Sequence, residues 1–198
     1  MSKTSKSKAK VIKPGSEAST GLRELLVDSL KDLLWAENAI IESLPIMIEN
    51  ATSEDLVEAL KNHLEETQTQ VTRLEEVFGL LNETAEPRKC AAMEGILKEG
   101  KEIMENTAVG YVRDAGIIAA GQKVEHYEIA SYGTVIAFAK TLGETESALI
   151  LQHTLDEEKL ADDKLSEVAE LYVNAEAAGN EADDSTLEEV VEVKEPEM

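Results

Sequence analysis

The sequence predicts an all-α fold, a bundle of four long helices with one extra short helix in the long crossover connection. Two observations predict it. Glycine and proline are sparse in the middle of the chain, and apolar residues recur at alternating steps of three and four along four long segments. Aromatic residues make up only 4% of the chain, so aliphatic side chains must fill the core between these helices.

The helices are bounded by capping residues and by glycine. Ser19 or Thr20 is expected to cap the first helix, and Thr52 or Ser53 the second, which Gly79 then ends. Two long hairpins joined by a long connection form a bundle with one crossover. The predicted helices cover residues 22–49, 53–78, 88–106, 109–142 and 145–175.

The ends of the chain differ from its middle in composition. Residues 1–19 form a lysine-bearing tail, residues 20–176 the helical bundle, and residues 177–198 an acidic tail poor in large apolar groups. We interpret both tails as disordered, solubilising segments. The alternative for the first is a basic arm that touches DNA or a partner.

Charge and cysteine content narrow the functional classes. The net charge of −22 argues against nonspecific binding of the bundle to nucleic acid or anionic lipid, and it favours attraction of cations. Cys90 is the only cysteine, which rules out an intramolecular disulfide and indicates a reducing compartment. With no apolar run long enough to span a bilayer and no signal-peptide core, the predicted location is cytoplasmic, away from membranes.

The apolar stripes are interrupted by acids near the middle of each helix. In the first helix, the stripe that runs from Leu26 to Met47 contains Glu37. The acids near the stripes of the other three long helices are Glu66 in the second, Glu125 and Glu128 in the third, and Glu158 and Asp162 in the fourth.

Mid-helix positions of an antiparallel bundle lie at one level, so these carboxylates are expected to converge. Burying an ionised carboxylate without a partner is strongly unfavourable. The three clean stripes, those of the first, third and fourth long helices, contain no Lys or Arg. Two divalent metal ions bridged by carboxylates would remove the repulsion. The alternative is that each acid lies at the edge of the core with its head in water.

Five long blocks of the chain carry a resemblance to a known family: DLLWAENAI (32–40), HLEETQTQVTRLEEVF (63–78), RKCAAMEGILKEG (88–100), QKVEHYEIASYGT (122–134) and TLDEEKLADDKL (154–165). In this order they resemble the YciE/YciF-type ferritin-like family, which is rubrerythrin-like. The resemblance implies a ferritin-like fold, a dinuclear metal site, a homodimer and a link to bacterial stress responses. It does not supply a reaction.

By position, the resemblance carries metal-ligand roles onto Glu37 of WAEN, the two glutamates of VEHYEI, and the two in-register acids of DEEKLADD; on the second helix our choice is Glu66. The sequence departs from the wider pattern of Glu-x-x-His on two helices. Thr69 and Ala161 stand where those histidines would be, and Gln70 and Asp162, one residue further on, can substitute. An oxygen-rich site of this kind favours manganese or binds iron more weakly.

Further polar residues are alternative ligands or groups that orient a ligand. His63 and His126 lie near the inner arc, and either is a ligand or a hydrogen-bond donor to a carboxylate. Gln122 is a candidate of the second kind. Cys90 is interpreted as a small buried hydrophobe, with a redox role as the alternative.

Three functional hypotheses follow. The first is a dinuclear iron or manganese protein that acts in stress by consuming peroxide or oxidising ferrous iron. The second is a non-enzymatic, stress-associated dimeric helical module whose metal site is structural or degenerate. The third is an iron-storage or DNA-protecting cage, which the lysine tail suggests.

Overall fold

The computed structural model describes residues 12–16 and 18–185, and this part of the chain is almost entirely helical. The predicted lysine-bearing residues 1–11 and the acidic residues 186–198 lie outside the described range. The elements are α1 (Leu22–Asn50), α2 (Glu54–Leu80), α3 (Ala91–Asn106), α4 (Tyr111–Leu142), α5 (Thr145–Val168), the π-helical turn η1 (Ala169–Val173) and α6 (Asn174–Ser185).

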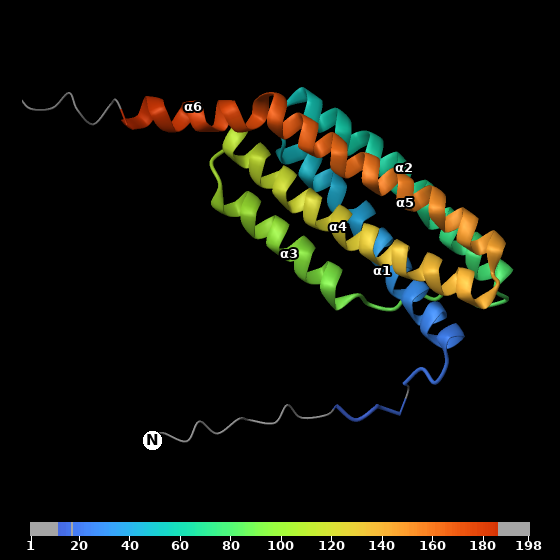
Figure 1. Ribbon diagram of the computed structural model, residues 1–198. Coiled ribbons are helices and arrows are strands. Elements are labelled where there is room, and N and C mark those ends of the chain that lie inside the picture. Colours follow the sequence, from blue (N-terminus) through green and yellow to red (C-terminus); the bar gives the residue numbers. More distant parts are fainter. Residues whose placement is uncertain (1–11, 17, 186–198) are drawn as a thin grey trace, which may run out of the picture.

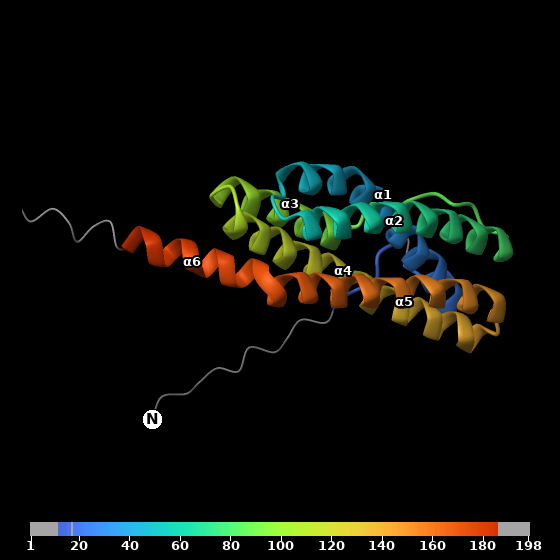
Figure 2. The ribbon, with the colours of Figure 1, turned by 90° about the horizontal axis from the view of Figure 1, so that it is seen from above.

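Four long helices form a bundle in which each contacts two neighbours. Helix α1 packs on α2, α2 on α5, α5 on α4, and α4 on α1. The hairpins α1–α2 and α4–α5 are joined by a long crossover that contains α3, which lies along α4 and α1 (Figure 1). Figure 2 shows the same bundle from above, with α3 beside it. The predicted ferritin-like arrangement is confirmed. None of the described helices has the length and apolarity needed to cross a membrane.

The start of α1 differs from the prediction. Gly21, not Ser19 or Thr20, is the N-cap residue, and its lack of a side chain leaves the cap without a side-chain hydrogen bond. The backbone N–H of Thr20 instead donates to the Glu24 carboxylate at 2.6 Å. This carboxylate is in the first turn, where the helix dipole favours negative charge.

The start of α2 is held from two sides. Ser53 is the N-cap, as one of the two predicted residues, and its hydroxyl accepts from the N–H of Leu56. Asp114 of α4 is fully buried, and its carboxylate accepts from the N–H groups of Thr52 and Ser53, both at 2.8 Å. The crossover therefore joins two helices, α2 and α4, that are also linked by these hydrogen bonds.

Two helix ends were misplaced by the sequence reasoning. Gly79 does not end α2, which continues to Leu80, and the chain turns at Asn82, whose φ is 54°. The last predicted helix is interrupted by η1 and continues as α6 to Ser185, beyond the predicted boundary at residue 176. Residues 175–178 are three alanines and one glutamate, which are good helix formers, and this outweighs the lack of large apolar groups there.

The core consists of two apolar clusters. The turn-end core, near the α4–α5 turn, includes Leu26, Leu30, Leu74, Phe78 and Leu151. The α3-end core, near the crossover helix, contains the following buried residues among others: Ile40, Leu44, Leu56, Leu60, Met93, Ile118 and Leu165. On each long helix the residues of one core precede those of the other. Between them lies a polar layer of buried side chains, Glu37, His63, Thr67, Gln70, Glu125, Glu128 and Glu158.

Candidate metal centre

Four residues of the polar layer form a compact cluster. His63 of α2, Glu125 and Glu128 of α4, and Glu158 of α5 each offer a ligand atom, and these atoms all lie within 4.8 Å of one another. The three glutamates are between 0% and 3% exposed. Glu125 and Glu128 are three residues apart, so they share one face of α4.

Glu37 brings a fourth carboxylate to the same layer from α1. The Tyr132 hydroxyl donates to its Oε1, and this tyrosine is fully buried at the edge of the turn-end core. Its Oε2 is buried and has no hydrogen-bond partner among the described residues. The tyrosine therefore fixes one oxygen of Glu37 and leaves the other free to bind.

Many polar atoms of this layer lack partners. Leaving such groups buried and unpaired costs about 1–3 kcal/mol each, and more for charged groups. Among the described residues of this layer, the unpaired buried atoms are Oε2 of Glu37, both ring nitrogens of His63, Oε1 of Gln70, Oε2 of Glu125, both carboxylate oxygens of Glu128 and Oε2 of Glu158; Oδ1 of Asp162, outside the layer, is also unpaired. A ligand that supplies positive charge would satisfy most of them at once.

The carboxylates raise one another's proton affinity. Burial, followed by the charge of Glu158, raises the pKa of Glu37 and Glu125 well above the ordinary glutamate value. Burial, followed by the charge of Glu37, does the same to the pKa of Glu128, and burial also raises the pKa of Glu158. No ion pair among the described residues joins a Lys or Arg to these four groups.

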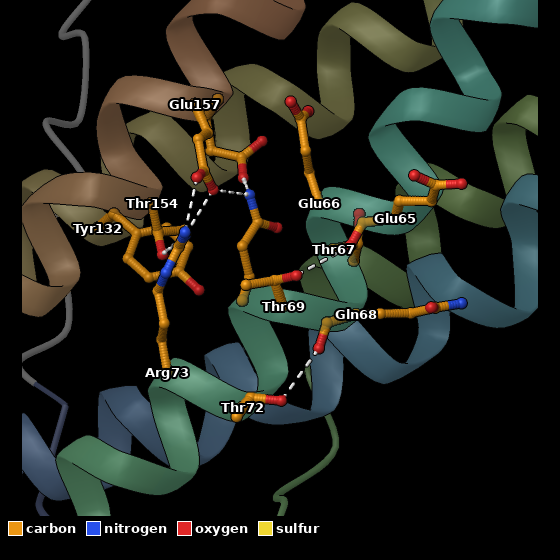
Figure 3. A network of polar contacts seen from close by, with 12 residues as sticks. Glu65, Glu66, Thr67, Gln68, Thr69, Thr72, Arg73, Tyr132, Thr154 and Glu157 are labelled. Atoms are coloured by element: carbon orange, nitrogen blue, oxygen red, sulfur yellow. Dashed lines mark hydrogen bonds and ion pairs between the residues drawn. The ribbon is translucent and has the colours of Figure 1, made fainter.

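Gln70 holds the cluster on its α2 side. Its Nε2 donates to Oε1 of Glu158 at 2.5 Å and to Oε2 of Glu157 at 3.2 Å. Arg73 forms a bidentate pair with Glu157, and Figure 3 shows this pair bridging α2 and α5. The arginine thus pairs with the outer glutamate, Glu157, while Oε2 of the inner one, Glu158, has no partner among the described residues.

The structure places Glu66 at the rim and not in the cluster. Its side chain is 46% exposed, and its Oε2 lies 3.8 Å from Nδ1 of His63. The buried stripe of α2 passes through His63, Thr67 and Gln70, and each helix position turns by about 100°, so Glu66 faces outward. Figure 3 shows the side chains of Glu65 and Glu66 leaving α2 in different directions.

The prediction of Glu66 as the α2 ligand rests on its carboxylate, which matches the acids of the other three long helices. The group that α2 delivers to the cluster is an imidazole. His63 Nε2 lies 3.5 Å from Oε1 of Glu125. The signal was available in the series Leu56, Leu60, His63, Thr67, Gln70, Leu74, Val77, which keeps steps of three and four when polar residues are allowed in it.

The remaining candidates lie next to the cluster. Asp162 is half-buried, and its Oδ2 lies 3.3 Å from Nε2 of His126, which is 69% exposed. Gln122 donates to the Ser166 hydroxyl at 2.8 Å and so does not bond to a cluster carboxylate. Cys90 is buried as predicted, and it is also the N-cap of α3, where its Sγ accepts from the N–H of Met93.

A cavity connects the cluster with solvent between α2 and α5. Its volume is about 270 Å³, and it reaches His63 and Glu125 at its inner end. Three acids, Asp55, Glu58 and Glu66, line it toward the outside, together with one lysine. This negative lining raises the local concentration of cations and gives them a route to the cluster.

Known proteins share this fold. Residues 21–178 match the family described as Domain of unknown function (DUF892). The chain is 41% identical over 157 residues to Protein YciF of Escherichia coli strain K12, covering 79% of this chain and 95% of that protein. The crystal structure of the E. coli stress protein YciF superposes with a TM-score of 0.76 at 40% identity, covering 79% of this chain and 99% of that one. YcfI from Rhodopseudomonas palustris, described as a candidate structural protein, gives a TM-score of 0.75 at 43% identity, covering 77% and 97%.

Proposed function

This chain belongs to the DUF892 family, and on that premise we propose that its polar layer is a dinuclear carboxylate centre for iron or manganese. The observation that carries the proposal is the set of unpaired buried carboxylate oxygens from three helices. Protonation neutralises such a carboxylate only by removing its negative charge. Cations can neutralise them and use their lone pairs.

The donor set fits two hard or borderline divalent ions. Four ionised glutamates carry four negative charges, which two divalent cations balance. Oxygen donors with one imidazole suit iron and manganese better than they suit the thiolate-preferring metals. The residues that would hold the ions are Glu37, Glu125, Glu128, Glu158 and His63.

The chain's own residues prepare the site in distinct ways. Tyr132 donates a hydrogen bond to Oε1 of Glu37, and Gln70 donates one to Oε1 of Glu158, so one oxygen of each glutamate is fixed. Glu66 and Asp162 lie outside the cluster, 3.8 Å from His63 and 3.3 Å from His126. The two apolar cores exclude water from above and below the layer. Bound iron or manganese would supply electrons or Lewis acidity to a small oxygen species.

The reaction we propose is peroxide consumption or oxidation of ferrous iron during stress, in line with the description of YciF as a stress protein. The alternative function is a non-enzymatic module whose metal site only stabilises the bundle. Two observations favour that alternative: the centre offers a single buried histidine, and YcfI is described as a candidate structural protein. The homodimer expected from the sequence stays a prediction, which the native mass in solution would test.

Metal content is the direct test. Full-length protein freed of metal and reconstituted with Fe(II) or Mn(II) without oxygen should bind two equivalents by elemental analysis. Glu128→Gln should lose at least one equivalent, because it removes a charged donor without changing its shape. Glu65→Gln, which changes an exposed acid of α2 outside its buried stripe, is the matched control and should bind normally. Less than one equivalent in the unmodified chain would overturn the proposal.

Turnover separates the two functions. The enzymatic proposal expects the reconstituted protein to consume hydrogen peroxide or to oxidise excess ferrous iron over many cycles, and expects Glu128→Gln to lose this activity. The structural alternative expects full metal binding with a higher melting temperature and no turnover.

A further inference from the structure

A second cavity lies on the opposite side of the bundle, beneath α3. It has a volume of about 100 Å³ and opens between α1, α3 and α4. Its lining is apolar apart from Ser43 and Lys101, and it contains no acid. The contrast with the acidic cavity between α2 and α5 is therefore one of chemistry as well as of position.

This cavity shares four lining residues with a smaller cavity that touches the polar layer. This smaller, inner cavity has a volume of about 10 Å³. Both cavities are lined by Ser43, Met47, Leu97 and Val124. The smaller one also touches His63 and Glu125, the two cluster residues that the acidic cavity reaches from the other side.

The width of this route limits what can pass. The inner cavity has room for about one water-sized molecule, which excludes organic substrates. Met47 and Leu97 are long, flexible side chains, and methionine in particular adapts to irregular space. Close packing of α3 on α4 keeps the route narrow, because a Cβ at Gly100 would lie 3.2 Å from that of Ala120.

We propose that this apolar passage admits dioxygen to the polar layer, while cations enter through the acidic cavity. The inference rests on the proposed metal centre for its purpose, but the passage itself is a property of the metal-free chain. Dioxygen is small, uncharged and without hydrogen bonds to lose on entry. Hydrogen peroxide would have to give up its hydrogen bonds to water along the apolar lining. A cation would meet no compensating charge there.

Dissolved dioxygen itself is the probe for the passage. Because dioxygen is paramagnetic, it speeds the relaxation of methyl protons near the places it visits. In the full-length metal-free protein under raised oxygen pressure, the methyl groups of Met47 and Val124 should relax severalfold faster than those of Leu155 and Ile136. The latter two lie in the turn-end core and match the first two in burial, at 8% and 4% exposed against 8% and 5%. Equal enhancement at both sets would overturn the proposal.

A plug at the junction provides the second test. Ser43→Phe places a ring where the two cavities meet, and Asn38→Phe adds the same ring on the exposed side of α1 as the control. The plug should abolish the extra relaxation at Val124. It should also slow aerobic oxidation of bound ferrous iron about tenfold, with anaerobic iron binding unchanged. In that reaction, two ferrous ions give two electrons that, with two protons, convert dioxygen to hydrogen peroxide.

The outcomes are distinguishable. If the unmodified protein binds no iron, the metal centre fails while the relaxation test still decides the passage. If the plugged protein binds iron and is oxidised at the normal rate, the passage fails and the metal centre stands. Ser43→Met is a smaller plug for use if the phenyl ring prevents folding, and an unchanged Val124 relaxation in it would count equally against the proposal.

Discussion

The turn-end core and the polar layer are built from the same four helices by the same spacing, yet they have opposite properties. In the core, Leu30, Leu74 and Tyr132 pack against one another, and their burial itself stabilises the fold. One or two turns along α1, α4 and α5, the inward positions hold glutamates, each with at least one carboxylate oxygen that has no partner among the described residues. The comparison shows that position within a stripe fixes burial, whereas residue type decides whether that burial stabilises the protein.

The largest effect on stability should come from truncating a side chain of the turn-end core. Leu30→Ala removes a fully buried side chain and should lower the free energy of unfolding by about 2–5 kcal/mol. Metal stoichiometry should stay unchanged at temperatures where the variant is folded. Urea unfolding and elemental analysis measure the two quantities. If the folded Leu30→Ala variant also lost bound metal, the turn-end core and the polar layer would not be separable.

A substitution in the polar layer should raise the free energy of unfolding of the metal-free protein instead of lowering it. Glu128→Gln removes a charge whose pKa is raised by burial and by Glu37. The free energy of unfolding of the metal-free variant should therefore exceed that of the metal-free parent by about 1 kcal/mol or more at neutral pH. Paired urea titrations without metal check this. A destabilised metal-free variant would mean that the carboxylate has a partner that the structure does not show.

The pH dependence of the metal-free protein should follow from the same groups. The raised pKa values of Glu37, Glu125, Glu128 and Glu158 mean that the folded state binds more protons than the unfolded one. This contribution to stability is complete below the unfolded value of about 4.5 and is lost as the pH rises through the raised values. Unfolding titrations between about pH 5 and pH 8 should show declining stability. Glu128→Gln should reduce the slope.

The smallest effect should come from the rim. Glu66→Gln removes a carboxylate 3.8 Å from the imidazole of His63, too far for a strong hydrogen bond. It should weaken metal binding by no more than about tenfold, the lower end for groups that orient a ligand. Competition titration with a metal chelator measures the affinity. A loss as complete as that of Glu128→Gln would restore Glu66 to the set of ligands that the sequence predicted.

The fold and most of the polar layer could be predicted because periodicity constrains them directly. On α1, Glu37 occupies one position of a regular three-and-four spacing whose other members are apolar, so its burial follows from spacing alone. On α2, two overlapping series left the phase open by one residue, and the preference for an acid selected Glu66 over His63. Spacing also cannot reveal the cavity under α3, which depends on how Met47 and Leu97 fill space between separate helices.

The division of the bundle into two hairpins has a consequence for assembly. One hairpin contributes Glu37 and His63, and the other contributes Glu125, Glu128 and Glu158. Neither hairpin carries the full set, so an ion bound by both can bind only after the two hairpins have docked. Such an ion would not speed the formation of either hairpin, but it would slow their separation. Dissociation of the ion would then report the first step in the unfolding of the bundle.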